Sequence, residues 1–383
     1  MPARIFVLFC FLSCLCSCLS EPKRNKTTFK TGGLINPVEA TGYKIQQNNG
    51  FQKLTVIDPW QKSSDNQFDY YLLEKGKVIP PELKDKQVFF TPLSRVICLS
   101  TTHIGFLDAL GEVSSVIGLS GSAYLTHPEV KKGVAENRIR EVGYERGLNY
   151  EMIVQLKPDV VFAYGVGSEI NAQMNKLHDL GIPVVLVGEY LEQSPLGKAE
   201  WIRFFGAFYQ KGEMAGKAWE KIRRNYDTIR SKVAKIPGRP SVLTGLPFKD
   251  TWWIAGGQSN LAVMIRDAGG KFLWEDNPSK EAFPVSLEEV FLRASKADFW
   301  INCGSAGNLD GLMAFDQRFS DLQSVRKLQV YNNNLRSTSG GGNDYWESGV
   351  VHPDLVLSDL VKIFHPELAT DKEFYYYKKL SHD

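Results

Sequence analysis

The chain has 383 residues, of which 45 are Lys or Arg and 43 are Asp or Glu, so its formal net charge is only +2. This length can bury a large core and leaves room for two domains. Basic residues do not form blocks interleaved with aromatics, which disfavours nucleic acid as a ligand. Aromatic residues make up 12% of the chain and several gather in segments that otherwise resemble loops, which indicates a surface for a flat or apolar ligand.

The N-terminus has the pattern of an export signal. An apolar run from Ile5 to Leu12 follows Arg4 and is too short to span a bilayer permanently. The next segment, Leu15-Cys16-Ser17-Cys18, resembles the bacterial lipobox, in which the cysteine after the cleavage site receives lipid. We expect residues 1–18 to be a lipoprotein signal peptide and Cys18 to carry the lipid, with the body periplasmic and anchored to the membrane. An ordinary secretory signal with incidental cysteines is the alternative.

The other cysteines and the histidines disfavour a bare metal site. Cys98 and Cys303 both lie in apolar runs and are expected to be buried small hydrophobes rather than a disulfide or a ligand pair. The six histidines include no i, i+4 pair and no HExxH motif. We therefore predict no bound metal ion and no resident cofactor.

Residues 19–92 are expected to form a tether and a small β appendage. The tether is polar and rich in Lys and Arg, so nothing favours its packing. Short alternating stretches such as 53–57 and 68–73 then follow, separated by Asn, Gly, Pro and Ser, which is typical of strands and turns.

From residue 95 onward the pattern changes to strands alternating with helices, which predicts mainly parallel sheets covered on both faces. The expected strands are 96–100, 116–119, 159–164, 182–187, 241–244, 252–255, 299–303 and 328–331. The expected helices are 102–110, 149–156, 169–180, 260–268, 287–294 and 354–364. Two α/β lobes follow, at residues 93–197 and 237–383.

The segment between the lobes, residues 198–236, is expected to be a helical linker. Apolar residues recur there at three- and four-residue steps from Trp201 to Val233, and charged residues fill the other face. A helix over 213–234 would span roughly 33 Å and could hold two lobes rigidly. Gly212 is a candidate interruption, and a core helix inside one domain is the alternative.

Short motifs accompany the strands in a fixed order, among them Val116-Ile117-Gly118, Leu156-Lys157-Pro158-Asp159 and Leu180-Gly181-Ile182-Pro183. In this order and spacing the chain from Ser94 to Phe364 resembles the periplasmic binding proteins of ABC transporters for iron-siderophores, haem and cobalamin, of the helical-backbone class III type. The resemblance implies an α/β fold of two Rossmann-like lobes with parallel sheets joined by one long rigid helix. It also implies a ligand cleft between the lobes, and an ABC permease and ATPase complex as the partner. The β appendage lies outside the family pattern.

In the first lobe, the candidate ligand-binding residues are His103, Tyr124, Tyr144 and Arg146. The segment from Ser100 to His103 follows a strand and opens a helix, so free amides and a hydroxyl there suit an anionic group. Simple helix capping is the alternative. Arg146 could hold carboxylates or hydroxamates by bidentate hydrogen bonds, with a loop salt bridge as its alternative role.

In the second lobe, the candidates are Trp253, Phe283, Asp344, Tyr345 and Trp346. Adjacent strand residues face opposite sides, so only one of Trp252 and Trp253 is expected to contact ligand. The last three follow a run of glycines that would let the backbone approach a ligand, and two of them offer flat faces for a corrin, porphyrin or catechol. The resemblance implies that Asp344 matches a ligand-contacting Asp of cobalamin-type relatives.

Two glutamates are candidates for docking onto the permease. Asn149 is followed two residues later by Glu151, and Ser286 likewise by Glu288, each at the start of a predicted helix. Helix capping explains part of this pattern. The resemblance implies that glutamates at these positions bind arginines of the two permease subunits.

Other functions remain open at this point. A hydrolase with a dispersed active site could use the same scaffold, although the chain has no GxSxG, GxxxxGK[ST] or GxGxxG motif in the required context. A surface lipoprotein without a transport role is a further alternative. Among ligands, a ferric siderophore is slightly preferred to cobalamin, and haem could be ligated by His103, His352 or a tyrosine. An importer component that is not an enzyme is the preferred prediction.

Overall fold

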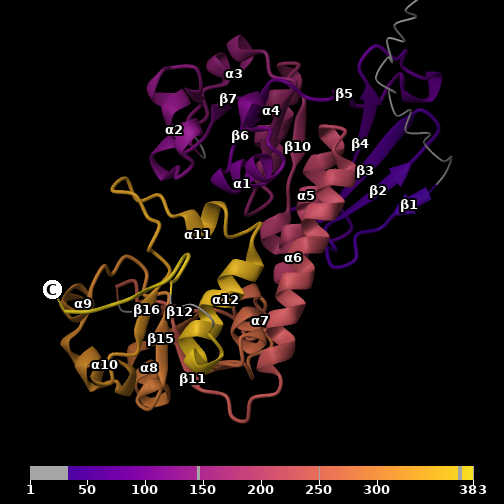
Figure 1. The fold of residues 1–383 in the computed structure, drawn as a ribbon. Helices are drawn as coiled ribbons and strands as arrows, with labels where there is room; N and C mark the ends of the chain where they lie inside the picture. Colours follow the sequence, from indigo (N-terminus) through magenta and orange to yellow (C-terminus); the bar gives the residue numbers. More distant parts are fainter. Residues whose placement is uncertain (1–32, 145–146, 250, 370–372, 383) are drawn as a thin grey trace, which may run out of the picture.

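The computed structural model describes residues 33–383 except 145–146, 250, 370–372 and 383 (Figure 1). Cys18 and the tether therefore lie outside the described residues. A small sheet, an upper α/β lobe and a lower α/β lobe follow one another along the chain. The predicted fold class, two α/β lobes preceded by a β appendage, is confirmed. Within the described ranges, no helix combines the length and apolar character needed to cross a bilayer.

The appendage is a five-stranded sheet in the order β1-β2-β3-β4-β5, antiparallel except for the last pair. Its strands are β1 (Gly33–Ile35), β2 (Tyr43–Gln47), β3 (Phe51–Ile57), β4 (Gln67–Glu74) and β5 (Val88–Thr91). Buried and exposed residues alternate along β2, because one face of the sheet packs on a helix and the other meets solvent. The ring of Tyr43, for example, lies 4.9 Å from that of Trp201.

The first lobe contains a wholly parallel sheet in the order β10-β9-β6-β7-β8. Its strands are β6 (Val96–Cys98), β7 (Val116–Leu119), β8 (Arg140–Glu141), β9 (Val160–Ala163) and β10 (Val184–Leu186). Its helices are α1 (Thr101–Ala109), α2 (Pro128–Ala135), α3 (Tyr150–Leu156) and α4 (Ile170–Asp179). All residues of β6, β9 and β10 are buried, as their continuous apolar runs predict for strands covered on both faces.

The second lobe contains a sheet in the order β13-β11-β15-β16-β17, parallel except for its last pair. The strands are β11 (Ser241–Thr244), β13 (Lys271–Phe272), β15 (Phe299–Ile301), β16 (Val330–Asn332) and β17 (Lys378–Lys379). The helices are α7 (Asn260–Asp267), α8 (Leu287–Ala294), α9 (Leu309–Phe315), α10 (Gln323–Arg326), α11 (Asp344–Glu347) and α12 (Pro353–Phe364). The strand expected at 252–255 does not join this sheet. It forms β12 (Thr251–Ile254), which pairs antiparallel with β14 (Phe283–Ser286).

The two lobes share a structural detail that relates them by a repeat. Asp159, just before β9, accepts hydrogen bonds from the backbone N–H and the hydroxyl of Ser94 at 2.8 and 2.9 Å. Asp298, just before β15, binds the same two groups of Ser241, both at 2.8 Å. In each lobe this carboxylate ties the start of one central strand to the start of its neighbour, so the same contact recurs in both lobes.

Two consecutive helices, rather than one, connect the lobes. They are α5 (Pro195–Phe208) and α6 (Gly212–Val233), and Gln210 between them has a positive φ of 56°, which a continuous helix cannot contain. On the first-lobe side, Phe205 of α5 stacks on Phe106 at 4.9 Å. On the second-lobe side, Tyr226 of α6 donates to Asp267 at 2.8 Å. The helices run along one side of the molecule and leave the lobes facing each other (Figure 1).

Candidate ligand-binding site

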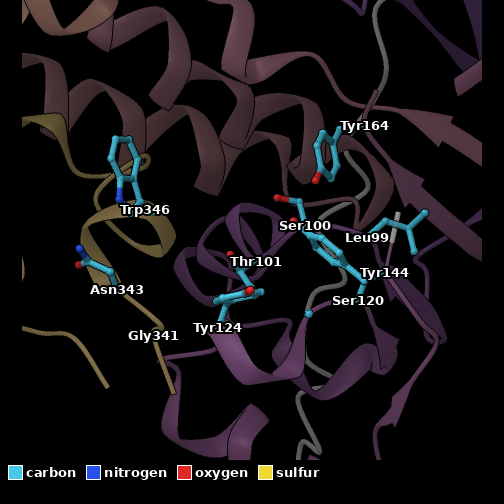
Figure 2. Close-up of a pocket in the computed structure, with 11 residues that line it drawn as sticks. Leu99, Ser100, Thr101, Ser120, Tyr124, Tyr144, Tyr164, Gly341, Asn343 and Trp346 are labelled. Atoms are coloured by element: carbon cyan, nitrogen blue, oxygen red, sulfur yellow. The ribbon is translucent and has the colours of Figure 1, made fainter. Parts of the chain in front are cut away.

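A cleft of about 260 Å³ lies between the lobes, at the carboxyl edge of the first parallel sheet (Figure 2). Ligands of open α/β sheets bind at this edge, because the loops after the strands meet there. First-lobe residues that follow β6, β7 and β9 form one wall, and the loop before α11 with α11 itself forms the other. The lining residues are Leu99, Ser100, Thr101, Ser120, Gly121, Tyr124, Tyr144, Tyr164, Gly341, Asn343 and Trp346.

The beginning of α1 lies at the base of the cleft on the first-lobe side. Ser100 is its N-cap, and its hydroxyl accepts a hydrogen bond from the Thr102 N–H at 3.3 Å. The Ser100 and Thr102 hydroxyls lie 2.9 Å apart, and Thr102 donates to Glu189 at 2.7 Å. Burial raises the pKa of the Glu189 carboxyl. A chain of hydroxyl groups therefore leads from the cleft to a buried carboxyl group.

Two tyrosines stand at the mouth of the first wall. The ring centroids of Tyr124 and Tyr144 are 6.2 Å apart, and about half of each side chain is exposed, 50% and 46% respectively. Tyr124 ends a short 3-10 helix that begins after Gly121, whose φ of 76° favours glycine. Glu141 accepts hydrogen bonds from the amides of Gly121 and Ser122 at 3.1 and 2.7 Å, and so fixes this turn.

Trp346 provides the aromatic surface of the opposite wall. It is 57% exposed, and its ring meets that of Tyr345 edge-on at 4.7 Å and 87°. Tyr345 in turn packs edge-on against Tyr376 and Tyr377, at 6.0 and 5.9 Å. Figure 2 shows Trp346 and Asn343 on one side of the cleft, with Tyr124 and Tyr164 across from them. A planar ligand could thus lie between tyrosine and tryptophan rings.

A second hollow of about 290 Å³ continues from the first. The two share Leu99, Ser120 and Tyr164, and the second extends along the first turn of α4 to Glu169 and Gln173. None of the residues that line the first cleft, as far as the structure describes them, is a Lys, Arg, His, Asp or Glu. Among the described residues that line the second hollow, Glu169 alone is charged. The site is therefore aromatic, hydroxyl-rich and poor in charge.

The prediction that His103 contacts the ligand is wrong. His103 is fully buried in the core, where its ring lies 6.2 Å from Phe162 and 5.8 Å from Phe205. Neither ring nitrogen has a hydrogen-bond partner among the described residues, and burial lowers the pKa of His103 to about 3. The physical reason is helix geometry: Thr101 in the first turn of α1 faces the cleft, and His103, two residues further along the helix, points to the opposite side, into the core.

Asp344 and Tyr345, also predicted to contact the ligand, are not among the residues that line the cleft. Asp344 is buried, and one of its oxygens pairs with Arg336 Nε at 2.5 Å while the other accepts from the Thr126 hydroxyl at 3.3 Å. Tyr345 supports Trp346 from behind and is not among the lining residues. Both predictions of direct contact are therefore corrected to supporting positions. His352, which precedes α12, is not in the described lining either.

The remaining candidates fall into three groups. Trp253 is 54% exposed and Trp252 is fully buried, so one of the pair does face outward, but Trp253 does not line the cleft. Phe283 is half-buried in β14 beside Ile254 and packs on the core, also away from the cleft. Arg146 lies outside the described residues. Of the predicted ligand contacts, Tyr124, Tyr144 and Trp346 are brought together.

The sequence reasoning missed several lining residues. Tyr164 follows β9 directly, and Ser120 follows β7 directly. Both could have been found from their places at the carboxyl ends of predicted parallel strands. Asn343 is the N-cap of α11, a four-residue helix that no periodicity reveals.

The described residues contain no group of three or more His, Cys, Asp or Glu side chains that could hold a metal ion. Cys98 and Cys303 are free and buried, and burial raises the pKa of both thiols. A metal bound to the described residues would therefore be held by at most two His, Cys, Asp or Glu side chains, or would arrive already bound in a chelate.

Two α/β lobes with an aromatic cleft between them and helices along one side have the architecture of a bilobal solute-binding protein. The family model described as periplasmic binding protein matches residues 96–333, more than half of the chain, and the chain belongs to this family.

The chain is also similar to individual known proteins. An uncharacterized lipoprotein of Methanocaldococcus jannaschii is 27% identical over 364 residues, covering 91% of this chain and 82% of that protein. The vitamin B12-binding protein of Yersinia pestis is 26% identical over 226 residues, covering 58% of this chain and 73% of that protein. Among solved structures, a periplasmic heme binding protein from Pseudomonas aeruginosa has a TM-score of 0.58 at 16% identity, covering 76% of this chain and 99% of that one, which shows a shared fold.

Proposed function

We propose that this chain is the substrate-binding lipoprotein of an ABC importer, and that it captures a bulky metal chelate in the interlobe cleft and delivers it to the permease. The observation that carries the proposal is the cleft itself, in which Tyr124 and Tyr144 of one lobe face Trp346 of the other. Rings on opposing walls suit a flat or bulky ligand that closure of the lobes would enclose. Membership of the family supports a transport role rather than a catalytic one.

The candidate ligands are a ferric siderophore, haem and cobalamin. The names of relatives support this range, because one is a vitamin B12-binding protein and another a heme binding protein. The charge-poor lining of the described cleft favours chelates with little net negative charge, such as a corrinoid or a hydroxamate complex. A polyanionic catecholate complex, or haem with its propionates, would lose hydration there without gaining a cationic partner in the described lining. Arg146 is the candidate cation for such ligands.

A melting screen tests this function. A ligand that binds only the folded form raises the melting temperature by mass action, so the full-length protein is heated with cyanocobalamin, ferrioxamine B, a ferric tris-catecholate and haemin, each at about 100 μM to include micromolar binders. We expect a clear upward shift with at least one of them, larger for the first two than for the anionic pair. The chelate-binding proposal fails if none of the four shifts the transition.

We further propose that Cys18 carries the lipid and that the body lies in the periplasm. The leader pattern supports this, as does the description of a relative as a lipoprotein. In cell fractionation, wild-type protein should sediment with membranes, whereas Cys18→Ala protein should be found in the soluble fraction. Membrane association of the variant equal to that of the wild type would contradict lipidation at this residue.

The exposed glutamates Glu151 and Glu288 are proposed as the permease-docking residues. They lie in the first turns of α3 and α8, and Asn149 and Ser286 supply the helix caps, so capping does not require either glutamate. In Figure 1, α3 lies in the upper lobe and α8 at the bottom of the lower lobe. Two carboxylates separated in this way could set the orientation of the protein on a two-subunit permease.

A further inference from the structure

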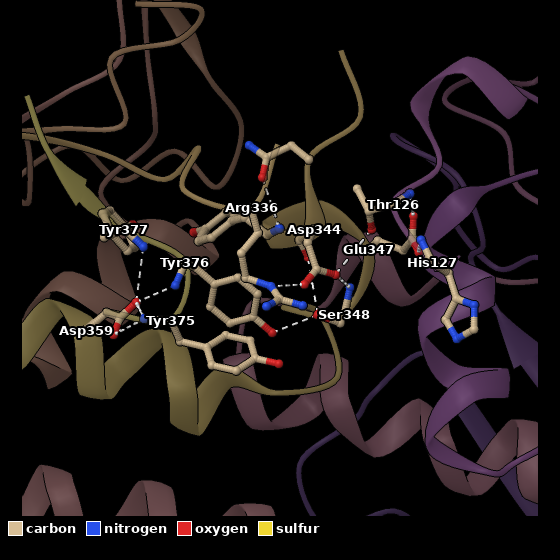
Figure 3. A network of polar contacts seen from close by, with 12 residues as sticks. Thr126, His127, Arg336, Asp344, Glu347, Ser348, Asp359, Tyr375, Tyr376 and Tyr377 are labelled. Carbon is tan, nitrogen blue, oxygen red and sulfur yellow. Dashed lines mark hydrogen bonds and ion pairs between the residues drawn. The ribbon is translucent and has the colours of Figure 1, made fainter. Parts of the chain in front are cut away.

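The segment that carries Trp346 also binds the opposite lobe. Glu347 is only 3% exposed, and its two carboxylate oxygens accept hydrogen bonds from the backbone N–H groups of Thr126 and His127, both at 2.8 Å (Figure 3). These amides precede α2 in the first lobe, where free N–H groups and the helix dipole favour a negative charge. Glu347 thus connects the second lobe to the first.

The backbone of this segment lies against the first lobe at two further places. A Cβ atom added to Gly105 in α1 would lie 2.3 Å from the carbonyl oxygen of Glu347, and one added to Gly342 would lie 2.5 Å from that of Tyr124. No side chain larger than hydrogen fits at either position without movement. The loop before α11 and α11 itself are therefore in close backbone contact with the same lobe that Glu347 binds.

The polar neighbours of Glu347 tie the segment to its own lobe and, through Asp344, also to the first lobe. Asp344 joins Arg336 to the Thr126 hydroxyl, and the Ser348 hydroxyl lies 2.9 Å from that of Tyr376. The amides of Tyr375, Tyr376 and Tyr377 are bound in turn by the buried carboxylate of Asp359 (Figure 3). Trp346 is thus placed between a fixed support in the second lobe and a carboxylate bound to the first.

We propose that Glu347 is a positioning residue for ligand binding: with the amides of Thr126 and His127 it forms an interlobe clasp that sets the spacing between Trp346 and Tyr124, and hence the affinity, without touching the ligand. The inference rests on the proposed function of the cleft. This clasp does not lock the lobes together. When they separate, water replaces the hydrogen bonds between the carboxylate and the two amides, so their net contribution to closure is modest.

The test combines a ligand-free readout with a ligand-binding readout on the full-length protein. In Glu347→Gln, one carboxylate oxygen is replaced by an NH2 group that cannot accept from an amide. Hydrogen exchange of the peptide that contains Thr126 and His127 should become about tenfold faster. Whichever of cyanocobalamin, ferrioxamine B, the ferric tris-catecholate and haemin binds the wild type should bind the variant about tenfold more weakly, mainly through faster dissociation.

Matched variants separate positioning from general damage. Glu129→Gln removes an exposed carboxylate one residue into α2, and we expect neither readout to change. Gly105→Ala keeps the Glu347 charge but places a methyl group against its carbonyl, and it should weaken binding in the same direction. This second variant decides the question if Glu347→Gln does not fold.

Two results would overturn the clasp. Exchange at Thr126 and His127 could be unaltered in Glu347→Gln, which would show that the carboxylate does not hold these amides. Alternatively, exchange could accelerate while affinity and dissociation rate stay at wild-type values, which would show that the contact does not control binding. If the wild type binds none of the four chelates, the proposed function of the cleft fails. If the wild type binds one of them and Glu347→Gln gives either result above, only the positioning role fails, so the two failures are distinguishable.

Discussion

Burial of His103 makes the stability of the fold sensitive to acid. The ordinary pKa of a histidine is about 6.5, and burial lowers that of His103 to about 3. Between these values the unfolded chain takes up a proton that the folded chain refuses, so the stability contributed at neutral pH is lost as pH falls below about 6.5. At pH 5 the loss from this residue is about 2 kcal/mol.

Urea unfolding at pH 7.5 and pH 5 checks this. The free energy of unfolding of the wild type should fall by about 2 kcal/mol more than that of His103→Leu, because every other titratable group is common to both proteins. An equal acid loss in both would mean that His103 becomes protonated in the folded state or is not buried.

At the scale of elements, the appendage is held to α5 by buried carboxylates. Glu200 is fully buried and accepts from the amides of Val38, Glu39 and Ala40 at 2.7 to 3.0 Å, and it also pairs with Arg203. Glu192 binds the next two amides in the same way. These contacts attach the segment before β2 to α5 and to the residues just before α5, so we expect the appendage to unfold with the lobes and not as a separate unit.

Glu200→Ala should reduce the free energy of unfolding by about 3–5 kcal/mol, because three amides and a guanidinium group lose a buried partner. Its matched control is Glu213→Ala, which breaks a fully exposed pair with Lys217 on α6 and should have no measurable effect. The comparison is made by chemical denaturation of both variants, and in a separate experiment by the rate at which a protease cleaves the N-terminal segment. Equal stabilities would contradict the role of Glu200.

The elements also show what could be predicted from sequence. Strands at 116–119 and 241–244 and the helix at 287–294 have the predicted bounds, because apolar runs and a serine cap mark them locally. β17 was missed because its two lysines carry no strand pattern and only pairing with β16 defines it. The break between α5 and α6 falls at Gln210, just before Gly212, the candidate interruption within an apolar stripe that itself continues through this point.

The site was predicted less completely than the fold, because a site depends on side-chain directions and on contacts between residues that are distant in the chain. The family resemblance indicated which loops meet at the cleft, and Tyr124, Tyr144 and Trp346, which were proposed on that basis, do line it. It does not show the direction in which a side chain leaves a helix, as at His103. Nor does it show partners that are distant in the chain, such as Thr126 and Arg336 for Asp344.

At the scale of the whole molecule, docking should depend on charge at both outer ends. Glu151→Arg combined with Glu288→Arg should abolish uptake in cells while ligand affinity and melting temperature stay nearly unchanged, because both side chains are exposed. The control is the pair Glu129→Arg with Glu281→Arg, two exposed glutamates that likewise lie one in each lobe. Normal transport by the first double variant, or its loss of ligand binding when purified, would contradict the docking assignment.

We expect a chelate held between the lobes to contact Trp346, which lines the cleft, whereas Trp253, with nearly the same exposure, lies away from it. The most direct measurement is therefore a calorimetric titration of wild type, Trp346→Ala and Trp253→Ala with whichever of the four chelates raises the melting temperature. We predict one ligand per chain, an affinity about tenfold weaker in Trp346→Ala because a stacking surface is lost, and no change in Trp253→Ala. Equal affinities in all three proteins, or a larger loss in Trp253→Ala, would contradict binding in the interlobe cleft.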